Sequence, residues 1–258
     1  MESAMDYHTA RALLEWQIEL GATEAILDAP VNRYETPAQK PKPKADAPIA
    51  PIKKPKIDPV QVAKTQAQGA GDLAALKATL AQFEHCDLRR GARSMVFADG
   101  NPAAKVMIIG EAPGRDEDRE GRPFVGRVGQ LFDRMFAAID LSRDGSEAES
   151  SVYVTNILPW RPPQNRDPKA DEIAMMMPFV ARHVELANPD ILVLMGNIAC
   201  QGVLGKRGVS RLRGHWVEAF GKPALPMYHP DALMRNPVLK REAWADLLDL
   251  KSRLNGKG

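Results

Sequence analysis

The sequence contains few cysteines: only Cys86 and Cys200 among 258 residues. Two thiols cannot form a disulfide framework and do not by themselves complete a metal site, so a reducing compartment is expected. The N-terminus lacks a basic segment followed by an apolar core, and no apolar run approaches the ~20 residues that span a bilayer. We therefore expect a cytoplasmic protein that is neither secreted nor inserted into a membrane.

The sequence also lacks the common motifs of cofactor-dependent enzymes. The segment GEAPGRDED, which begins at Gly110, has neither the third glycine of a dinucleotide fingerprint nor the Gly-Lys-Ser/Thr of a P-loop. No His-Glu-x-x-His or paired-cysteine pattern indicates a catalytic metal, and no serine-centred elbow is present. The formal net charge of +2 does not by itself decide whether the chain binds nucleic acid.

Composition divides the chain into three regions. Residues 1–29 carry apolar side chains at helical spacing, which predicts an amphipathic helical segment that docks on the core or on a protein partner. Residues 30–70 are rich in Pro, Ala and Lys and predict a flexible linker, whose lysines either keep it soluble or contact DNA phosphates. Residues 71–258 are expected to form the folded domain.

That last region alternates between apolar runs and helical patterns. Strands are predicted at residues 106–109, 152–158, 191–195 and 224–228. Helices are predicted at residues 72–85, 126–139, 169–188, 198–204 and 239–254. Such alternation is typical of parallel strands joined by right-handed crossovers, so it predicts an α/β fold: a three-layer α/β/α sandwich around a mainly parallel four-stranded sheet.

Chemically distinctive residues follow three of these strands. Four carboxylates crowd into eight positions of the loop after the first strand: Glu111, Asp116, Glu117 and Asp118. A loop that only connects two elements would gain nothing from their mutual repulsion. Asn156 lies near the end of the second strand, and His229 follows the last one. Because ligands of open parallel sheets bind beyond the carboxyl ends of the strands, these groups are expected to share one site.

Three segments together resemble the uracil-DNA glycosylase superfamily, and most of all its family 4: GEAPGRDED with GRPFVG, VYVTNILPWRPPQNR, and YHPDALMRNPVLKREAW. The resemblance runs in order from about residue 73 to residue 254. It implies a uracil-DNA glycosylase-like fold and a monomeric enzyme that flips uracil out of DNA and hydrolyses its N-glycosidic bond. The product would be an abasic site, which initiates base excision repair.

The resemblance also implies which residues bind the base. Phe124 would supply the aromatic face on which uracil stacks, although a buried core position is the alternative. Asn156 would read O4 and N3–H of uracil, whereas an asparagine at a strand end can also simply cap a turn. Ala112 and Gly114 would shape the loop so that the backbone approaches the base.

The resemblance also implies the catalytic roles, and the charge that the reaction develops explains the residue types. Cleavage leaves positive charge on the sugar and negative charge on the departing base. His229 would donate a hydrogen bond to O2 of uracil, and Glu117 would orient water or stabilise the sugar cation. Glu111 would line the base pocket, with Asp116 and Asp118 as alternative carboxylates.

DNA contacts are expected in the segment after His229. Leu233 and Met234 would form an apolar wedge between bases, although Leu233 fits packing against the last helix equally well. Phosphate contacts are expected from Arg235, Lys240 and Arg241. A second basic strip, or else an ordinary solvated face, comprises Arg161, Arg166, Arg211 and Arg213.

The chain departs from the family pattern at the iron–sulfur cluster that family 4 holds through four cysteines. Only Cys86 matches a cluster ligand, and the other three positions hold Phe83, Trp160 and Met176. Cys200 lies in the wrong segment to replace them. We therefore expect a hydrophobic plug in place of the cluster, with no metal and no other cofactor.

Two alternatives to uracil excision stay open at this level. A glycosylase for another deaminated base, such as hypoxanthine, would have the same fold, because selectivity depends on side-chain positions in the pocket. A non-enzymatic DNA-binding relative that has lost the cluster is the other alternative. The presence of Glu117, Phe124, Asn156 and His229 argues against that second alternative.

Overall fold

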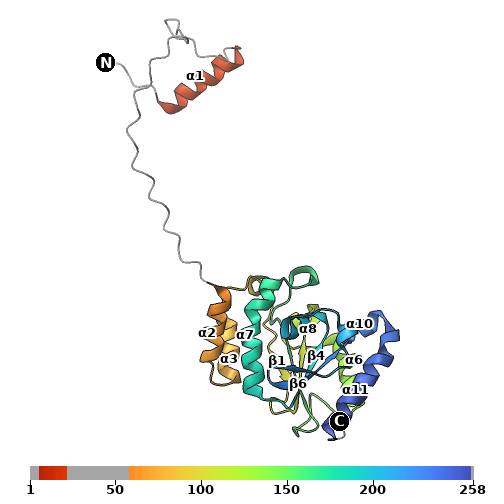
Figure 1. Ribbon diagram of the computed structural model, residues 1–258. Helices are drawn as coiled ribbons and strands as arrows, with labels where there is room; N and C mark the ends of the chain where they lie inside the picture. Colours follow the sequence, from red (N-terminus) through yellow and green to blue (C-terminus); the bar gives the residue numbers. More distant parts are fainter. Residues whose placement is uncertain (1–5, 22–57, 257–258) are drawn as a thin grey trace, which may run out of the picture. The chain divides into compact units, whose positions relative to one another are not determined.

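The computed structural model describes residues 6–21 and 58–256 and divides into two units, residues 1–56 and residues 57–258 (Figure 1). In the first unit, helix α1 (Tyr7–Glu19) begins at Asp6, whose carboxylate accepts hydrogen bonds from the first turn. α1 lies in the region expected to be helical. The rest of that region and residues 30–57 of the expected linker lie outside the described residues.

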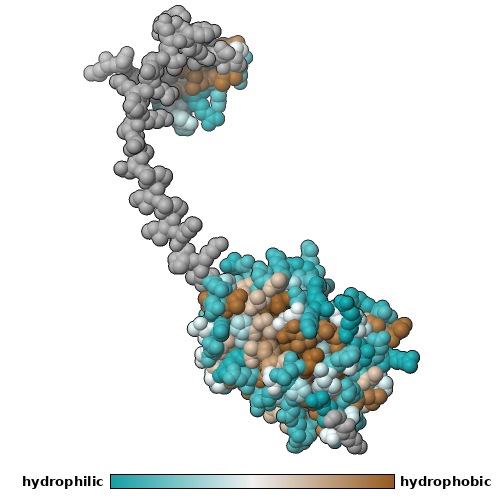
Figure 2. Space-filling view, viewed as in Figure 1, coloured by the Kyte–Doolittle hydropathy of each residue, from teal (hydrophilic) through white to brown (hydrophobic). Residues whose placement is uncertain are grey.

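α1 buries none of its residues. Figure 2 shows apolar as well as hydrophilic side chains on the surface of this unit. The exposed large apolar side chains of α1 and the residue after it are Tyr7, Leu13, Leu14, Trp16, Ile18 and Leu20.

The second unit is built on one six-stranded sheet with the order β1-β3-β2-β4-β6-β5. The strands are β1 (Ala98–Gly100), β2 (Val106–Gly110), β3 (Val152–Asn156), β4 (Ile191–Met195), β5 (Val217–Ala219) and β6 (Lys222–Met227). The four central strands are parallel and correspond to the four predicted from sequence, while β1 and β5 pair antiparallel at the edges. These edge strands have only three residues each, too few to produce a recognisable apolar run.

Both faces of the sheet are covered by helices (Figure 1). Successive residues of a strand point to opposite faces, so Met107 and Ile109 pack in one apolar cluster and Val106 and Ile108 in the other. The first cluster includes residues of α2 (Pro59–Gly69), α3 (Leu73–Gln82), α7 (Ala170–Ala187) and α8 (Asn197–Leu204). The second includes residues of α6 (Gly126–Ala137) and α11 (Lys240–Leu254). This arrangement confirms the three-layer α/β/α sandwich.

The folded unit begins earlier than composition predicts. The linker was expected to extend to residue 70, but α2 starts at its cap Asp58 and lies alongside α7. Its buried residues are Ala63 and Ala67. Two alanines give a close fit between helices with little apolar surface, so a search for large apolar side chains overlooks this helix.

Short helices complete the second unit in the connections between the larger elements. They are α4 (Leu88–Gly91), α5 (Arg115–Glu120), η1 (Pro163–Asn165), α9 (Val209–Leu212), α10 (Pro230–Arg235) and η2 (Pro237–Leu239). Two of them, α5 after β2 and α10 after β6, stand at the carboxyl ends of parallel strands.

The order of the strands creates a crevice at one end of the sheet. From β2 the chain continues to β3 on one side and then to β4 on the other, so the connections after β2 and β4 leave in opposite directions. Such a reversal opens a ligand-binding crevice beyond the carboxyl ends of the two strands. The acidic loop after β2 and the start of α8 after β4 border this crevice.

Candidate active site

Gly110, the last residue of β2, brings two expected base-binding residues together. A Cβ atom at this position would lie 2.3 Å from Oδ1 of Asn156 and 2.7 Å from the Phe124 ring. Only a residue without a side chain leaves room for both groups. Asn156 and Phe124 therefore converge on the end of β2, as their shared role predicts.

The Phe124 ring is buried rather than exposed. Its centroid lies 4.6 Å from that of Phe132 and 5.2 Å from that of His229, and the side chain has no exposed surface. The backbone of Phe124 has φ 51°, a left-handed conformation that non-glycine residues seldom adopt. A base can stack on this ring only after the groups that cover it shift.

The Asn156 side chain is also buried, and its Nδ2 has no hydrogen-bond partner among the described residues. Leaving a buried amide donor unpaired costs about 1–3 kcal/mol. A ligand that accepts a hydrogen bond from Nδ2 would remove this cost. Among the described residues Asn156 Nδ2 caps no turn and is left available to a ligand.

Glu117 in α5 faces the loop that contains Phe124. Its carboxylate accepts hydrogen bonds from the backbone N–H of Gly114 and from that of Phe124. Burial raises the pKa of Glu117, while these two hydrogen bonds and the charge of Arg143 act in the opposite direction. The result is a carboxylate with a fixed orientation and an increased proton affinity, as a group that activates water requires.

The two alternative carboxylates considered above, Asp116 and Asp118, also lie on α5 but have different partners. Asp118 accepts hydrogen bonds from the backbone N–H of Arg93 at 2.8 Å and of Ser94 at 3.1 Å, so it anchors the preceding loop. Asp116 forms an ion pair with Arg119 at 3.1 Å. Of the three, Glu117 alone is held by the loop that carries Phe124.

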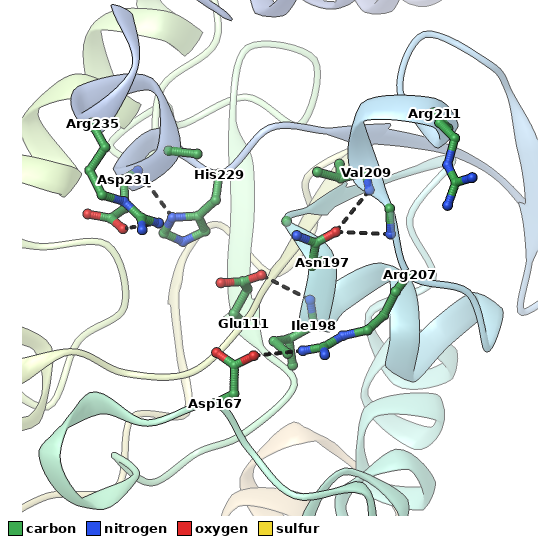
Figure 3. A pocket seen from close by; sticks show the side chains of 13 residues that line it. Glu111, Asp167, Asn197, Ile198, Arg207, Val209, Arg211, His229, Asp231 and Arg235 are labelled. Carbon is green, nitrogen blue, oxygen red and sulfur yellow. Dashed lines mark hydrogen bonds and ion pairs between the residues drawn. The ribbon is translucent and has the colours of Figure 1, made fainter.

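Glu111 crosses the crevice between β2 and β4 (Figure 3). Its Oε1 accepts a hydrogen bond of 2.9 Å from the backbone N–H of Ile198, at the start of α8. Gly196 has φ 98°, and a Cβ there would lie 2.4 Å from Glu111 Oε1. The position of the Glu111 carboxylate thus requires a glycine at residue 196. Glu111 also lines a hollow together with Ala112 and Gly114.

His229 follows β6 and caps the N-terminus of α10. Its Nδ1 accepts a hydrogen bond of 3.2 Å from the backbone N–H of Asp231. Burial lowers the pKa of His229, which keeps the imidazole neutral. With Nδ1 acting as the acceptor, the single proton of the neutral ring is on Nε2, which is left to donate to a ligand.

Two adjoining hollows of about 500 Å³ and about 300 Å³ open at this end of the sheet, and Figure 3 shows the side chains around the larger one. They share Glu111, Asp167, Ile198, His229 and Asp231. Neither hollow is lined by Phe124 or Asn156, which are buried.

Several residues around the larger hollow were missed by the sequence analysis. Asn197 accepts hydrogen bonds from the backbone N–H groups of Gly208 and Val209, and Asp167 pairs with Arg207 at 2.7 Å. A signal was available for Asn197, which begins α8 and is separated from the end of β4 only by Gly196, on the crevice where the strand order reverses.

The expected wedge residue Leu233 is 1% exposed and belongs to the apolar core. The packing interpretation is therefore correct for this side chain, and Met234 beside it is only half-buried. Val238, in η2 between α10 and α11, is instead 82% exposed. Leu233 lies on helix α10, which directs its side chain inward. The sequence did not indicate a helix in this segment.

The expected phosphate-binding residues divide into free and paired groups. Lys240 and Arg241 are exposed, while Arg235 is exposed but pairs with Asp231 at 2.9 Å. Arg161 donates to Asn165.

The second basic strip is reduced to two members. Arg166 forms two hydrogen bonds, of 2.9 and 2.6 Å, with the Glu172 carboxylate, and Arg213 pairs with the buried Asp246. Both arginines are held in ion pairs within the protein and are therefore not available to DNA phosphates. Arg211 lines the larger hollow and remains a candidate, as does Arg161.

The four positions that correspond to cluster ligands do not fit an iron–sulfur cluster. Phe83, Cys86, Trp160 and Met176 are all buried in the same apolar cluster. An iron–sulfur cluster of this type is held by four cysteine thiolates, and three of these four positions hold side chains without a thiol. Within residues 6–21 and 58–256 no three His, Cys, Asp or Glu side chains are grouped so as to hold a metal ion.

The described part of the chain also contains no helix that is long and apolar enough to cross a membrane.

Comparison with known proteins places these residues in a wider group. The family model described as "Uracil DNA glycosylase superfamily" matches residues 97–248. The type-4 uracil-DNA glycosylase of Archaeoglobus fulgidus is 38% identical over 170 residues, covering 62% of this chain and 82% of the relative. That of Thermotoga maritima is 33% identical over 178 residues, covering 67% and 90%. A type-5 enzyme of Pyrobaculum aerophilum is 30% identical over 149 residues, covering 53% and 66%.

Proposed function

The chain belongs to the uracil-DNA glycosylase superfamily, and from this premise we propose how its crevice excises uracil. Its activity is that of a uracil-DNA glycosylase, which hydrolyses the bond between uracil and deoxyribose and so begins base excision repair. The observation that carries the assignment of roles is the convergence on Gly110 of an unpaired buried amide, Asn156, and an aromatic ring, Phe124, which contacts the neutral His229.

Asn156 and Phe124 bind the flipped base. Uracil presents a carbonyl oxygen at position 4 and an N–H at position 3, which match the donor Nδ2 and the acceptor Oδ1 of Asn156. Cytosine presents an amino group and an unprotonated nitrogen at the same positions, so both contacts become mismatched. Entry of the base uncovers the Phe124 ring and gives the orphaned Nδ2 its partner.

His229 and Glu117 stabilise opposite charges in the transition state. Nε2–H of neutral His229 donates to O2 of uracil as negative charge develops on the departing base. Glu117, held by two backbone N–H groups, orients the attacking water and stabilises the positive sugar. Glu111, Ala112 and Gly114 form the wall of the hollow on this side.

Val238 replaces Leu233 as the side chain that enters the DNA base stack. It is exposed on a short turn directly after α10, the helix that His229 caps. Met234 supports this turn in our proposal. Phosphate contacts come from Arg161, Arg235, Lys240 and Arg241.

The state of the working protein is also part of the proposal. We propose that it acts as a monomer in the cytoplasm, without an iron–sulfur cluster, because the four cluster positions hold a buried apolar group. The exposed apolar side chains of α1 are a surface for a protein partner.

Single-turnover excision from labelled oligonucleotides tests the assignment of roles. Glu117→Gln and His229→Ala should each slow uracil release by at least about 100-fold while binding of the same DNA changes little. Asn156→Asp should weaken discrimination against cytosine, because a carboxyl group accepts from its amino group; a two-point base contact contributes about 1–3 kcal/mol. Near-normal rates for the first two variants would refute the catalytic assignments, and unchanged base preference would refute that of Asn156.

The same assay measures the breadth of substrates. Duplexes that contain uracil, hypoxanthine or xanthine are incubated with the enzyme, and abasic sites are cleaved by alkali. Hypoxanthine and xanthine present a carbonyl oxygen beside an N–H, as uracil does with O4 and N3–H, so the Asn156 contacts do not distinguish them and the assay tests whether the pocket excludes the larger purine ring. Cleavage at uracil alone is expected from the similarity to uracil-DNA glycosylases. Faster release of hypoxanthine than of uracil would refute the proposed specificity for uracil.

A further inference from the structure

Arg143 lies after α6, outside the acidic loop and outside the three segments that carry the family resemblance. We propose that Arg143 is a positioning residue for uracil excision: its guanidinium clamps the loop at Pro123 and so fixes the orientation of Phe124 and Glu117. The inference rests on the proposed roles of those two residues. It adds a residue that touches neither base nor sugar.

The guanidinium uses all three of its nitrogen atoms. Nε and Nη2 donate to the two carboxylate oxygens of Asp133 at 2.9 and 2.8 Å. Nη1 donates to Oδ2 of Asp99 at 3.0 Å and to the backbone carbonyl of Pro123 at 2.9 Å. The Arg143 side chain is 10% exposed, so its bonds to Asp99 and to Pro123 are partly buried, whereas its bonds to Asp133 lie at the surface, where that carboxylate is 50% exposed.

These contacts join three parts of the unit. Asp99 belongs to edge strand β1, Asp133 to α6 and Pro123 to the loop before Phe124. Arg122 also pairs with Asp99, at 2.9 Å, so Asp99 holds Arg122 directly and Pro123 through Arg143. Two carboxylates against two guanidinium groups leave the cluster electrically balanced.

The loop needs such a support because Phe124 is held in an unfavourable conformation. Its φ of 51° lies in the left-handed region, where the Cβ of a non-glycine residue crowds the backbone. On one side, the N–H of Phe124 donates to Glu117. On the other, the carbonyl of Phe124 lies so close to α6 that a Cβ at Gly129 would be 1.9 Å from it.

Arg143 also supports the Phe124 ring indirectly. Its guanidinium carbon lies 5.5 Å from the centre of the Phe132 ring, which in turn lies 4.6 Å from that of Phe124. The clamp therefore fixes both the backbone before Phe124 and the ring beneath it. Because the N–H of Phe124 is one of two donors to Glu117, the same clamp sets the direction of that carboxylate.

The charge of Arg143 gives the clamp a signature that general stability would not produce. Of the charged groups that act on Glu117, Asp116 on its own helix raises its pKa and Arg143 from the neighbouring layer lowers it. Loss of Arg143 should therefore raise the pKa of Glu117. Since Glu117 must be ionised to act, the acid limb of the rate profile should then move to higher pH.

Single-turnover uracil excision tests the clamp with Arg143→Ala and Arg143→Lys. Arg143→Ala should slow excision about 10- to 100-fold, as expected when reacting groups are displaced by a fraction of an ångström to an ångström, with unchanged affinity for uracil-containing DNA. Arg143→Lys keeps the positive charge but loses the planar group that donates to two partners at once. It should return the acid limb toward that of the wild type while the maximal rate stays low.

Arg182→Ala is the matched control. Arg182 is also largely buried and donates to a backbone carbonyl, that of Ala70, and to a carboxylate, but it lies on α7 outside the active-site loop. Its loss should lower the melting temperature without moving the acid limb. Asp99→Asn, which weakens the clamp but leaves Arg143 in place, is the second variant in case Arg143→Ala does not fold.

The outcomes separate the clamp from the proposed function. Wild-type excision and an unmoved acid limb in Arg143→Ala, with Glu117→Gln inactive, would overturn the clamp and leave the roles of the site intact. Full activity in Glu117→Gln would instead overturn the proposed role of Glu117. Recovery of the full rate in Arg143→Lys would refute the need for the several hydrogen bonds of the guanidinium, because a single positive charge would then suffice.

Discussion

Gly110→Ala is the most direct test of how the base pocket is built. The added Cβ would lie 2.3 Å from Oδ1 of Asn156 and 2.7 Å from the Phe124 ring, well inside van der Waals contact. Both side chains are buried, so neither can turn into solvent to make room. The substitution should displace at least one of them from the position that a flipped uracil requires.

The structure sets the size of the effect. If the methyl group removes the two contacts of Asn156 with uracil, the loss is about 1–3 kcal/mol, which corresponds to about a 5- to 150-fold fall in kcat/KM. Affinity for undamaged DNA should not change, because Gly110 lies at the end of a buried strand away from the exposed cations. Single-turnover excision and binding of a uracil-free duplex measure the two quantities.

Gly71→Ala is the control for adding one methyl group to a glycine. A Cβ at Gly71 meets no atom within 4 Å, and its backbone does not have a positive φ. This variant should excise uracil at the wild-type rate. If Gly110→Ala did so as well, while folding normally, Asn156 and Phe124 could not both act from the positions described.

Three further predictions follow from burial and exposure. Val238→Ala should slow excision from double-stranded DNA more than from single-stranded DNA, because only a duplex needs a wedge. Equal losses on both substrates would exclude Val238 as the wedge. Leu233→Ala, which removes a buried side chain, should mainly lower the stability of the fold. Trp160→Ala should lower the free energy of unfolding by about 3–5 kcal/mol in urea titrations, and a loss below about 1 kcal/mol would contradict a packed apolar plug. Burial lowers the pKa of His183 to about 4, so the unfolded chain binds the proton more tightly and about 3 kcal/mol of stability should be lost as the pH falls from 6.5 to 4. His183→Gln should flatten that part of the stability profile, and an unchanged slope would show that His183 does not cause it.

The central sheet could be predicted because its strands are buried on both faces. Such strands read as continuous apolar runs, and residues 191–195 match β4 at both ends. The edge strands β1 and β5 carry no such signal, because each is short and only partly covered. Helix α2 was missed for a related reason: alanines, and not large apolar residues, form its contact with α7.

The location of the site could also be predicted, but the roles of similar residues could not. In the sequence, Glu117 and Asp118 are neighbouring carboxylates of one acidic loop. In the structure, their hydrogen-bond partners lie in different segments. Asp118 binds backbone N–H groups at residues 93 and 94, and Glu117 binds those at residues 114 and 124. Only the folded path of the chain distinguishes a carboxylate that anchors a loop from the one that we propose to be catalytic. The same limit applies to Leu233 and Val238, whose exposure depends on where α10 ends.

Three side chains of the proposed site share one means of orientation. Glu111, Glu117 and His229 each accept hydrogen bonds from backbone N–H groups, and within residues 6–21 and 58–256 no lysine or arginine pairs with them directly. A backbone donor has no side chain to substitute, so its direction changes only when the path of the loop changes. Gly110 and Arg143 act on that path, one by leaving space and the other by clamping it. Substitutions at these two positions should therefore damage excision without removing any group that touches the base.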